Sequence, residues 1–267
     1  MDYINILDVK INNISKQEAA KLFINFTKAN KQNIVVTPNA EILLQAQKNL
    51  QLKKILQTSN LNLPDSVSLL WAGMVVQNNW SLLRSIFELI FLPLRKFFWK
   101  NTFQEQICGS DFIYNICDLA QKNKKKIFLL GAQNNIANKT KLILEKKFPN
   151  LKIVGAIAGS PYTKDDHWVI DKINESSASI LLVAYGCPKQ EFWIQRNLEK
   201  CSFLKVAIGL GGTFDFIAGN IPRAPLFLRK IGLEWLFRLV KEPRRFIRIW
   251  QAVIIFPYTF LHWHFSR

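Results

Sequence analysis

IVVTPNAE, at residues 34–41, sets a pattern that later parts of the chain repeat. A short run of β-branched residues gives way to polar residues and then to a helical pattern, so we expect a strand that ends at Val36 and a helix that begins at Ala40. Asn39 suits the N-cap of that helix, because its amide oxygen can accept from the N–H groups of the first turn. Polar groups that follow a strand in this way collect where ligands bind in an open α/β sheet.

A second stretch of this kind, Leu61-Asn62-Leu63-Pro64-Asp65, ends in a carboxylate that has no cation close to it in the sequence. We expect a short strand there and a buried helix at 66–76. Asn39 and Asp65 each admit two interpretations. They are either cap and turn residues, which are the usual roles of these residue types, or parts of a ligand site at the ends of strands.

From Gly109 onwards, strand and helix patterns alternate with short loops. This alternation predicts an α/β fold with a mainly parallel sheet that helices cover on both faces. Three of the strands end in glycine-containing loops, which allow backbone N–H groups to approach phosphate. The later strands are expected at 127–130, 152–158, 179–185 and 205–210. The clearest helices are expected at 14–30, 40–50 and 136–147, with Ser15 as a possible cap of the first. A further helix is expected to follow Ser110 or Asp111 as its cap and to run to about Lys122.

The composition narrows the class of partner. The 267 residues carry a formal net charge of +17 and are 49% hydrophobic, with 20 Phe and 8 Trp. Such a charge favours an anionic partner: a nucleotide, a nucleic acid or an acidic membrane surface. The basic residues share segments with Phe, Trp and Leu, and no zinc-finger or RNP-type pattern occurs. We therefore favour a membrane surface over nucleic acid.

Several familiar signals are missing from the sequence. The first ten residues lack the basic and apolar regions of a signal peptide. The four cysteines form no CxxC pair and have no histidine at metal-ligand spacing, so we expect reduced thiols in a reducing compartment. No Asp-x-Asp or GxxxxGK[ST] sequence occurs, and Gly209-Leu210-Gly211-Gly212 matches GxGxxG poorly. We expect neither a metal nor another cofactor.

Two segments combine aromatic, apolar and basic residues. Residues 79–103 are interrupted by Pro93 and too short in apolar length to span a bilayer, so we expect either an interfacial amphipathic element or a hydrophobic helical hairpin packed on the domain. Residues 221–267 carry nine Arg or Lys against two Glu and end in the apolar run WQAVIIFPYTFLHWHF before the last two residues. We interpret this tail as a monotopic membrane anchor, with a C-terminal helix packed on the core as the alternative. The expected domains are a catalytic domain at 1–220 and a basic, membrane-associating appendage at 221–267.

An ordered set of motifs carries a family resemblance. TPNAEI, LPD, GSDF, FLLGA, GCPKQE, GLGGTFD and IPRAPLFLRKIGLEWLFRLVKEPRRFIR follow one another from residue 37 to 248. Each motif alone is common, but the ordered set is specific, and the chain resembles the WecG/TagA/CpsF glycosyltransferases. The resemblance implies a Rossmann-like α/β core with a basic C-terminal appendage. It also implies inverting, metal-independent transfer of N-acetylmannosamine or a related sugar from a UDP-sugar to a polyprenyl-diphosphate-linked saccharide in cell-surface polysaccharide synthesis.

The resemblance suggests roles for particular residues. Asp65 is the candidate catalytic base, with Thr37 and Asn39 beside it in the donor and acceptor pocket. Inversion needs one base near the acceptor hydroxyl. Departure of a diphosphate without a metal needs positive groups, for which helix N-termini, loop N–H groups and arginines of the tail are available. The expected substrate-binding residues are Gly131, Tyr162, Gly186, Gln190, Asp215, Arg223, Arg229 and Arg238.

Three further positions qualify this assignment. Ser66 stands where the family often has glycine, and Gln106 stands where it commonly has a basic residue before the G-[ST]-D motif. Glu191 lies in the first turn of an expected helix. It is either a rival to Asp65 or a residue that stabilises the helix dipole.

The expected setting is the cytoplasmic face of a membrane, to which the enzyme binds peripherally. Its expected partners are a UDP-sugar donor, a lipid-linked saccharide acceptor and an anionic membrane surface, without nucleic acid. The sequence does not fix the oligomeric state and is compatible with a homo-oligomer. Two other classes stay open: a nucleotide-dependent oxidoreductase, against which the poor GxGxxG match counts, and a basic nucleic-acid-binding module, which predicts a steep salt dependence of binding.

Overall fold

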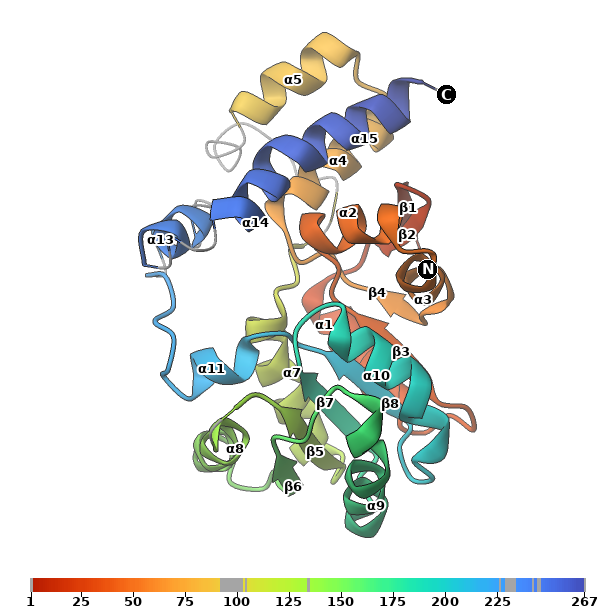
Figure 1. Cartoon of the computed structure of the whole chain (residues 1–267), viewed down its shortest axis with the longest axis vertical. Helices are drawn as coiled ribbons and strands as arrows, with labels where there is room; N and C mark the ends of the chain where they lie inside the picture. The colour runs from red at the N-terminus through yellow and green to blue at the C-terminus, as the bar shows by residue number, and fades with distance from the viewer. Residues whose placement is uncertain are drawn as a thin grey trace.

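The centre of the molecule is a six-stranded sheet with the strand order β4-β3-β8-β7-β5-β6 (Figure 1). The computed structural model describes residues 2–91, 103, 105–133, 135–225, 227–228, 234–241, 243 and 246–266, without the side chains of 234, 235 and 238. Every neighbouring pair in the sheet is parallel, which confirms the predicted α/β class and its Rossmann-like character. The strands are β3 (Asn33–Val36), β4 (Leu61–Asn62), β5 (Lys126–Gly131), β6 (Lys152–Ile157), β7 (Ile180–Ala184) and β8 (Val206–Gly209).

Helices cover both faces of the sheet because successive strand residues point to opposite sides. Leu182 and Ile208 belong to the core on one face, whereas their neighbours Leu181 and Ala207 belong to the core on the other. The first face is covered by α1 (Lys16–Phe26), α7 (Gly109–Lys122), α8 (Ile136–Lys147) and α11 (Thr213–Ile217). The second is covered by α9 (Asp166–Ser176) and α10 (Lys189–Asn197).

A third core lies beyond the β4 edge of the sheet and includes residues from both ends of the chain. It contains residues of α2 (Ala40–Lys48), α3 (Leu50–Thr58), α4 (Val67–Asn78) and the hairpin of β1 (Tyr3–Ile6) and β2 (Val9–Asn12). Trp71 of α4 and Phe260 of α15 (Phe256–Phe265) are fully buried here, with ring centroids 5.3 Å apart. The C-terminal helix therefore completes a core that the N-terminal part begins.

The hairpin was not expected from the sequence. Its two turn residues, Leu7 and Asp8, adopt positive φ angles of 52° and 64° although neither is glycine. Such turns normally carry Asn or Gly, and four-residue strands give a weak pattern. Burial of the apolar residues on one side of both strands compensates, because Ile6, Leu7 and Val9 are at most 1% exposed.

The helix caps were predicted with mixed success. Ser15 caps α1 in a reciprocal arrangement with Glu18, and Asn39 caps α2 by accepting from the Ile42 N–H at 3.0 Å, so both predictions are confirmed. Ser110 or Asp111 as the cap of α7 was wrong. That helix begins at Gly109 with Cys108 at the N-cap, and the Asp111 carboxylate is bound to Arg223 instead.

The C-terminal part consists of short helical pieces, the last two of which contribute to the third core. These are α13 (Glu234–Lys241), α14 (Phe246–Trp250), a π-helical turn at Gln251–Ile255 and α15. They lie in the same half of the molecule as α5 (Leu82–Ile90), as Figure 1 shows. No helix in the described part of the chain combines the length and the apolarity that crossing a bilayer requires.

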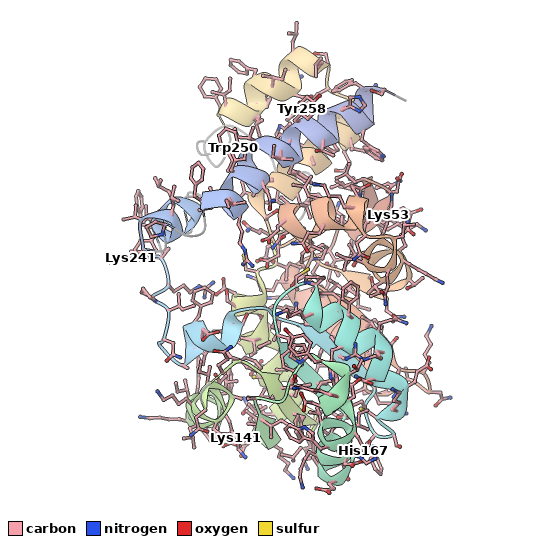
Figure 2. The ribbon with its side chains drawn as sticks, in the orientation of Figure 1. Lys53, Lys141, His167, Lys241, Trp250 and Tyr258 are labelled. Carbon is pink, nitrogen blue, oxygen red and sulfur yellow. The ribbon has the colours of Figure 1, made fainter. Side chains whose placement is uncertain are left out.

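The packing of a C-terminal helix on the core is confirmed for α15, and membrane anchoring by the tail stays a prediction. α15 packs on the core through Phe256 and Phe260, which are 0% exposed. Trp250 and Tyr258, labelled in Figure 2, are 50% and 71% exposed. One side of the tail is a core element and the other carries apolar and aromatic side chains in solvent.

Candidate active site

A pocket of about 500 Å³ lies beyond the carboxyl ends of β4, β3, β8 and β7. This is the edge at which open parallel sheets bind ligands. The structure brings together five of the sequence-predicted site residues in its wall: Thr37, Asn39, Asp65, Gly186 and Gln190. The two stretches that define the pattern of the sequence therefore meet at one site.

Four helices of nine or more residues begin at this pocket, and so does α11, which has five residues. Asn39 and Ala40 of α2, Ser66 and Val67 of α4, Cys108 and Gly109 of α7, and Cys187 and Gln190 at the start of α10 all line it. Each N-terminus places N–H groups and about half a positive charge at its end. Asn39 and Ser66 accept hydrogen bonds within their own helices, whereas neither described cap residue of α7 or α10 makes a side-chain capping bond. The arrangement suits an anionic group such as a diphosphate.

A backbone hydrogen bond holds Asp65 against the stretch that follows β3. Its N–H donates to the Pro38 carbonyl at 2.9 Å, which ties the residues after β4 to those after β3. Ser66, the next residue, caps α4 by accepting from the Leu69 N–H at 3.4 Å. A serine in this place therefore has a structural use that a glycine lacks.

Gln106 lies beside Asp65 in the pocket wall. Its side-chain amide donates to the Asp65 carbonyl at 3.4 Å and contacts the Cys108 sulfur at 3.3 Å. Both departures from the family pattern, at 66 and 106, are thus immediate neighbours of the candidate base.

Gln190 shapes the floor of the pocket. Its Oε1 accepts from the Gly211 N–H at 2.9 Å, and its Nε2 donates to Glu191 Oε1 at 2.8 Å. A Cβ on Gly209 would lie 2.4 Å from the Gln190 Nε2, so a larger residue there would displace this amide. Thr37 adds a second tie by donating to the Gly209 carbonyl at 3.2 Å. Gln190 therefore sets the position of the loop after β8, and both ends of its amide are occupied.

Glu191 lies beneath the pocket and is not part of its wall. Its side chain is 1% exposed, and burial raises the pKa of the carboxyl, an effect that the hydrogen bond from Gln190 opposes. Its carboxyl group reaches the pocket through two residues of the wall, Gln190 and Cys187, with which it forms side-chain hydrogen bonds. The structure favours a supporting role over that of a rival base.

The contribution of Arg248 was missed by sequence reasoning. Arg248 of α14, together with Ile249, Ala252 and Val253, closes the pocket from the side of the tail. Among the described residues that line the pocket, Arg248 is the one with a basic side chain. Its Nε lies 3.4 Å from Glu41 Oε1, and the side chain is 57% exposed. The motif EPRRFIR indicated a basic segment but did not assign Arg248 to the pocket.

Gly131, Tyr162 and Asp215 lie outside the pocket wall. Gly131 has φ +112°, and a Cβ there would meet the Ala184 backbone at 2.7 Å, so glycine is needed for the packing of β5 on β7. Tyr162 is 57% exposed and lies under the Lys189 ammonium group, 5.6 Å from the ring centroid. The Asp215 carbonyl accepts from the N–H groups of the residues at 220 and 221. Roles for these three residues in substrate binding stay predictions.

The structure describes the three predicted arginines of the tail to different extents. Arg223 is bound to Asp111, a residue of the pocket wall. Arg229 lies outside the described residues, and of Arg238 the structure places the backbone, in α13. No group of three or more His, Cys, Asp or Glu within the described residues is arranged to hold a metal ion.

Comparisons with known proteins give consistent results. The sequence model of the glycosyl transferase WecG/TagA/CpsF family matches residues 4–96 and 89–267. A protein of Bacillus spizizenii (strain ATCC 23059 / NRRL B-14472 / W23) is 34% identical over 228 residues, which are 85% of this chain and 77% of that protein. A protein of Bacillus subtilis (strain 168) is 30% identical over 224 residues, or 84% and 76% of the two chains. Both relatives are named N-acetylglucosaminyldiphosphoundecaprenol N-acetyl-beta-D-mannosaminyltransferase.

Proposed function

The chain belongs to the WecG/TagA/CpsF glycosyltransferase family, and from this premise we propose that it transfers N-acetylmannosamine from a UDP-sugar to a polyprenyl-diphosphate-linked GlcNAc during cell-surface polymer synthesis. The names of both relatives support the sugar and the acceptor. The observation that carries the proposal is the meeting of Asp65 with four helix N-termini in one pocket.

In the proposed reaction Asp65 is the general base. Its carboxylate takes the proton of the acceptor hydroxyl as that oxygen bonds to the anomeric carbon of the donor sugar. The bond from the anomeric carbon to UDP breaks on the opposite side, and UDP leaves with the electron pair, which inverts the configuration. A positioned base of this kind typically contributes a factor of about 10²–10⁴ to the rate.

The departing diphosphate requires positive groups that are already in place. We assign this work to the N-termini of α7 and α10 and to Arg248, without a metal ion. The absence of an Asp-x-Asp sequence and the position of Arg248 in the pocket wall support this assignment. Ser66 and Gln106, next to Asp65, take part in positioning the acceptor.

We place the enzyme peripherally on the cytoplasmic face of a membrane. The acceptor of the relatives carries an undecaprenyl chain, which stays in lipid while its saccharide enters the pocket. The exposed Trp250 and Tyr258 lie on the tail segment that also supplies Arg248 to the pocket. The absence of CxxC pairs supports a reducing compartment.

The test is a donor screen with purified full-length protein. A panel of UDP-sugars is offered with a short-chain lipid-diphosphate GlcNAc acceptor, and UDP release is measured together with the mass of the product. We expect release above background with UDP-N-acetylmannosamine and a product one N-acetylhexosamine heavier. Release with another UDP-sugar alone would refute the donor assignment, and no release with any donor would refute the proposed acceptor.

A further inference from the structure

The helix α5 buries polar residues and exposes most of its apolar ones. Its buried residues are Ser85 and Glu88, at 0% and 7% exposure. A helix on a soluble protein normally buries its apolar stripe and exposes its polar residues. Leu89 packs partly against the third core, but the other apolar side chains are in solvent: Leu82 44%, Leu83 81%, Ile86 41%, Phe87 58%, Ile90 69% and, at the C-cap, Phe91 38%.

A hydrogen bond from α4 holds α5 in this orientation, and two further contacts lie within α5 and its cap. The Trp71 indole N–H of α4 donates to the Ser85 carbonyl at 3.0 Å, and the Ser85 hydroxyl donates to the Ser81 carbonyl at 2.9 Å. Glu88 lies 3.8 Å from Arg84 along the helix. Burial raises the pKa of the Glu88 carboxyl, and the charge of Arg84 opposes the shift. A rotation that buried the apolar face would break the indole bond.

The exposed face of α5 lies in the half of the molecule that also carries the exposed side of the tail. Figure 1 shows α5, α4 and α15 together at one end, with α8 and α9 at the other. α4 contacts both α5 and α15. Trp250 and Tyr258 mark this half in Figure 2, whereas Lys141 and His167 mark the opposite end.

The charges near the apolar face of α5 indicate what kind of partner binds there. Arg84 is 60% exposed at the side of the apolar residues and stacks on Trp80, with its guanidinium carbon 4.9 Å from the ring centroid. Apolar residues with a basic residue at their margin, in a protein of net charge +17, match an anionic lipid surface, into which such helices bury their apolar face. A second copy of the chain would bring an equal positive charge to the contact.

We propose that α5 is a second lipid-inserting element, lying in the surface of an anionic bilayer with the side chains of Leu83, Phe87 and Ile90 in the acyl boundary. The choice of a lipid surface rests on the proposed function, since a lipid-linked acceptor has to be met at the bilayer. Two separate contacts, α5 and the tail, fix the orientation of the enzyme on the membrane. Val253, which lines the pocket, belongs to the same tail segment as the exposed Trp250 and Tyr258, so the proposed tail contact lies close to the pocket.

The test compares two double variants of the full-length chain. Phe87→Ser/Ile90→Ser removes the apolar face of α5, and Leu142→Ser/Ile143→Ser on α8 removes side chains of similar exposure, 66% and 41%, from the other end. Sedimentation is measured with vesicles of phosphatidylcholine containing about one third phosphatidylglycerol, and with phosphatidylcholine alone. We expect the α5 variant to lose at least about tenfold in binding to the anionic vesicles, the control variant to match the wild type, and the wild type to bind neutral vesicles more weakly.

Two further measurements keep the result interpretable. The rate on a water-soluble acceptor without vesicles should be unchanged in the α5 variant, and Leu83→Ser, which alters one exposed side chain, should show a smaller loss in the same direction. Undiminished vesicle binding by the α5 variants overturns the proposal. So does a wild-type dimer in light scattering that the α5 variant converts to a monomer, because the face would then belong to a second copy. Vesicle binding is independent of UDP release, so a failure of the proposed reaction is seen separately.

Discussion

Arg223 donates two hydrogen bonds to Asp111, from Nη1 to Oδ1 and from Nη2 to Oδ2, each at 2.7 Å. The pair joins the segment after α11 to the first turn of α7. Paired charge-assisted bonds of this geometry add orientation as well as energy. The beginning of the C-terminal segment is therefore fixed to the wall of the pocket, since Asp111 is part of that wall.

The pair can be tested with a double-mutant cycle of Asp111→Asn and Arg223→Gln. We expect a coupling free energy of about 1 kcal/mol from denaturant unfolding, because Asp111 is partly exposed to solvent. If Arg223 only fastens the chain, the double variant has the same KM for the donor as Asp111→Asn alone. A higher KM in the double variant assigns Arg223 a direct contact with the diphosphate.

Asp65→Asn should lower kcat by about two to four orders of magnitude, the usual contribution of a general base, while UDP binding and Tm stay near those of the wild type. The backbone bond from Asp65 to Pro38 is retained in this variant, so the loop keeps its position. Asp118→Asn, which removes an ion pair with Lys122 on the surface of α7, is the matched control. A kcat above about a third of the wild-type value would return Asp65 to the role of a turn residue.

Arg248→Gln should raise the KM for the donor about tenfold, since a charge-assisted hydrogen bond to an anion is worth about 1.5–3 kcal/mol. Lys241→Gln, an exposed basic residue of α13, is the control and should change little. Steady-state kinetics on the soluble acceptor separate this effect from membrane binding. Equal KM values for both variants and the wild type contradict a contact between Arg248 and the donor.

Two substitutions of Glu191 test whether it is the catalytic base or a residue that supports Gln190. Glu191→Gln keeps an oxygen that accepts from the Gln190 amide, so most of kcat should remain. Glu191→Ala leaves that buried amide without its acceptor and should cost about 1–3 kcal/mol of stability, with a lower kcat/KM through the displaced Gly211 loop. A loss in Glu191→Gln as large as that in Asp65→Asn would make Glu191 the base.

Chelation tests the proposed metal independence. Activity measured in excess EDTA should equal that in its absence, because helix N-termini and Arg248 supply the positive charge. The same assay with added Mg²⁺ or Mn²⁺ is the comparison. Loss of activity in EDTA that either ion restores contradicts the mechanism.

The parts of the fold that follow local rules were predictable. The strand at 34–36, the Asn39 cap and the later alternation of strands and helices all depend on residues close in sequence. The coincidence of Asp65 with Thr37 and Asn39 followed as well, because parallel strands end at one edge. The alternation of strands and helices does not determine the order of the strands in the sheet. The position of Gly131, at the end of β5, relative to the pocket could therefore not be predicted.

The remaining features depend on contacts between distant parts of the chain. Arg248 forms an ion pair with Glu41, which lies far from it in the sequence. Asp111 binds Arg223 and does not cap α7. The apolar pattern of α5 indicated a buried or interfacial helix equally well. Only the position of Trp71, which bonds to the Ser85 backbone, shows which face is turned inward.

The packing of Trp71 against Phe260 also determines when the third core can be completed during synthesis. A ribosome makes α4 long before α15, and the contact between them can form only when both have been made. Until α15 emerges, the Trp71 side of α4 has no cover from the tail, and the core around β1, β2 and α2 cannot close. A variant without α15 would leave the Trp71 side of α4 uncovered and open to proteases, so the two segments, far apart in the sequence, protect each other.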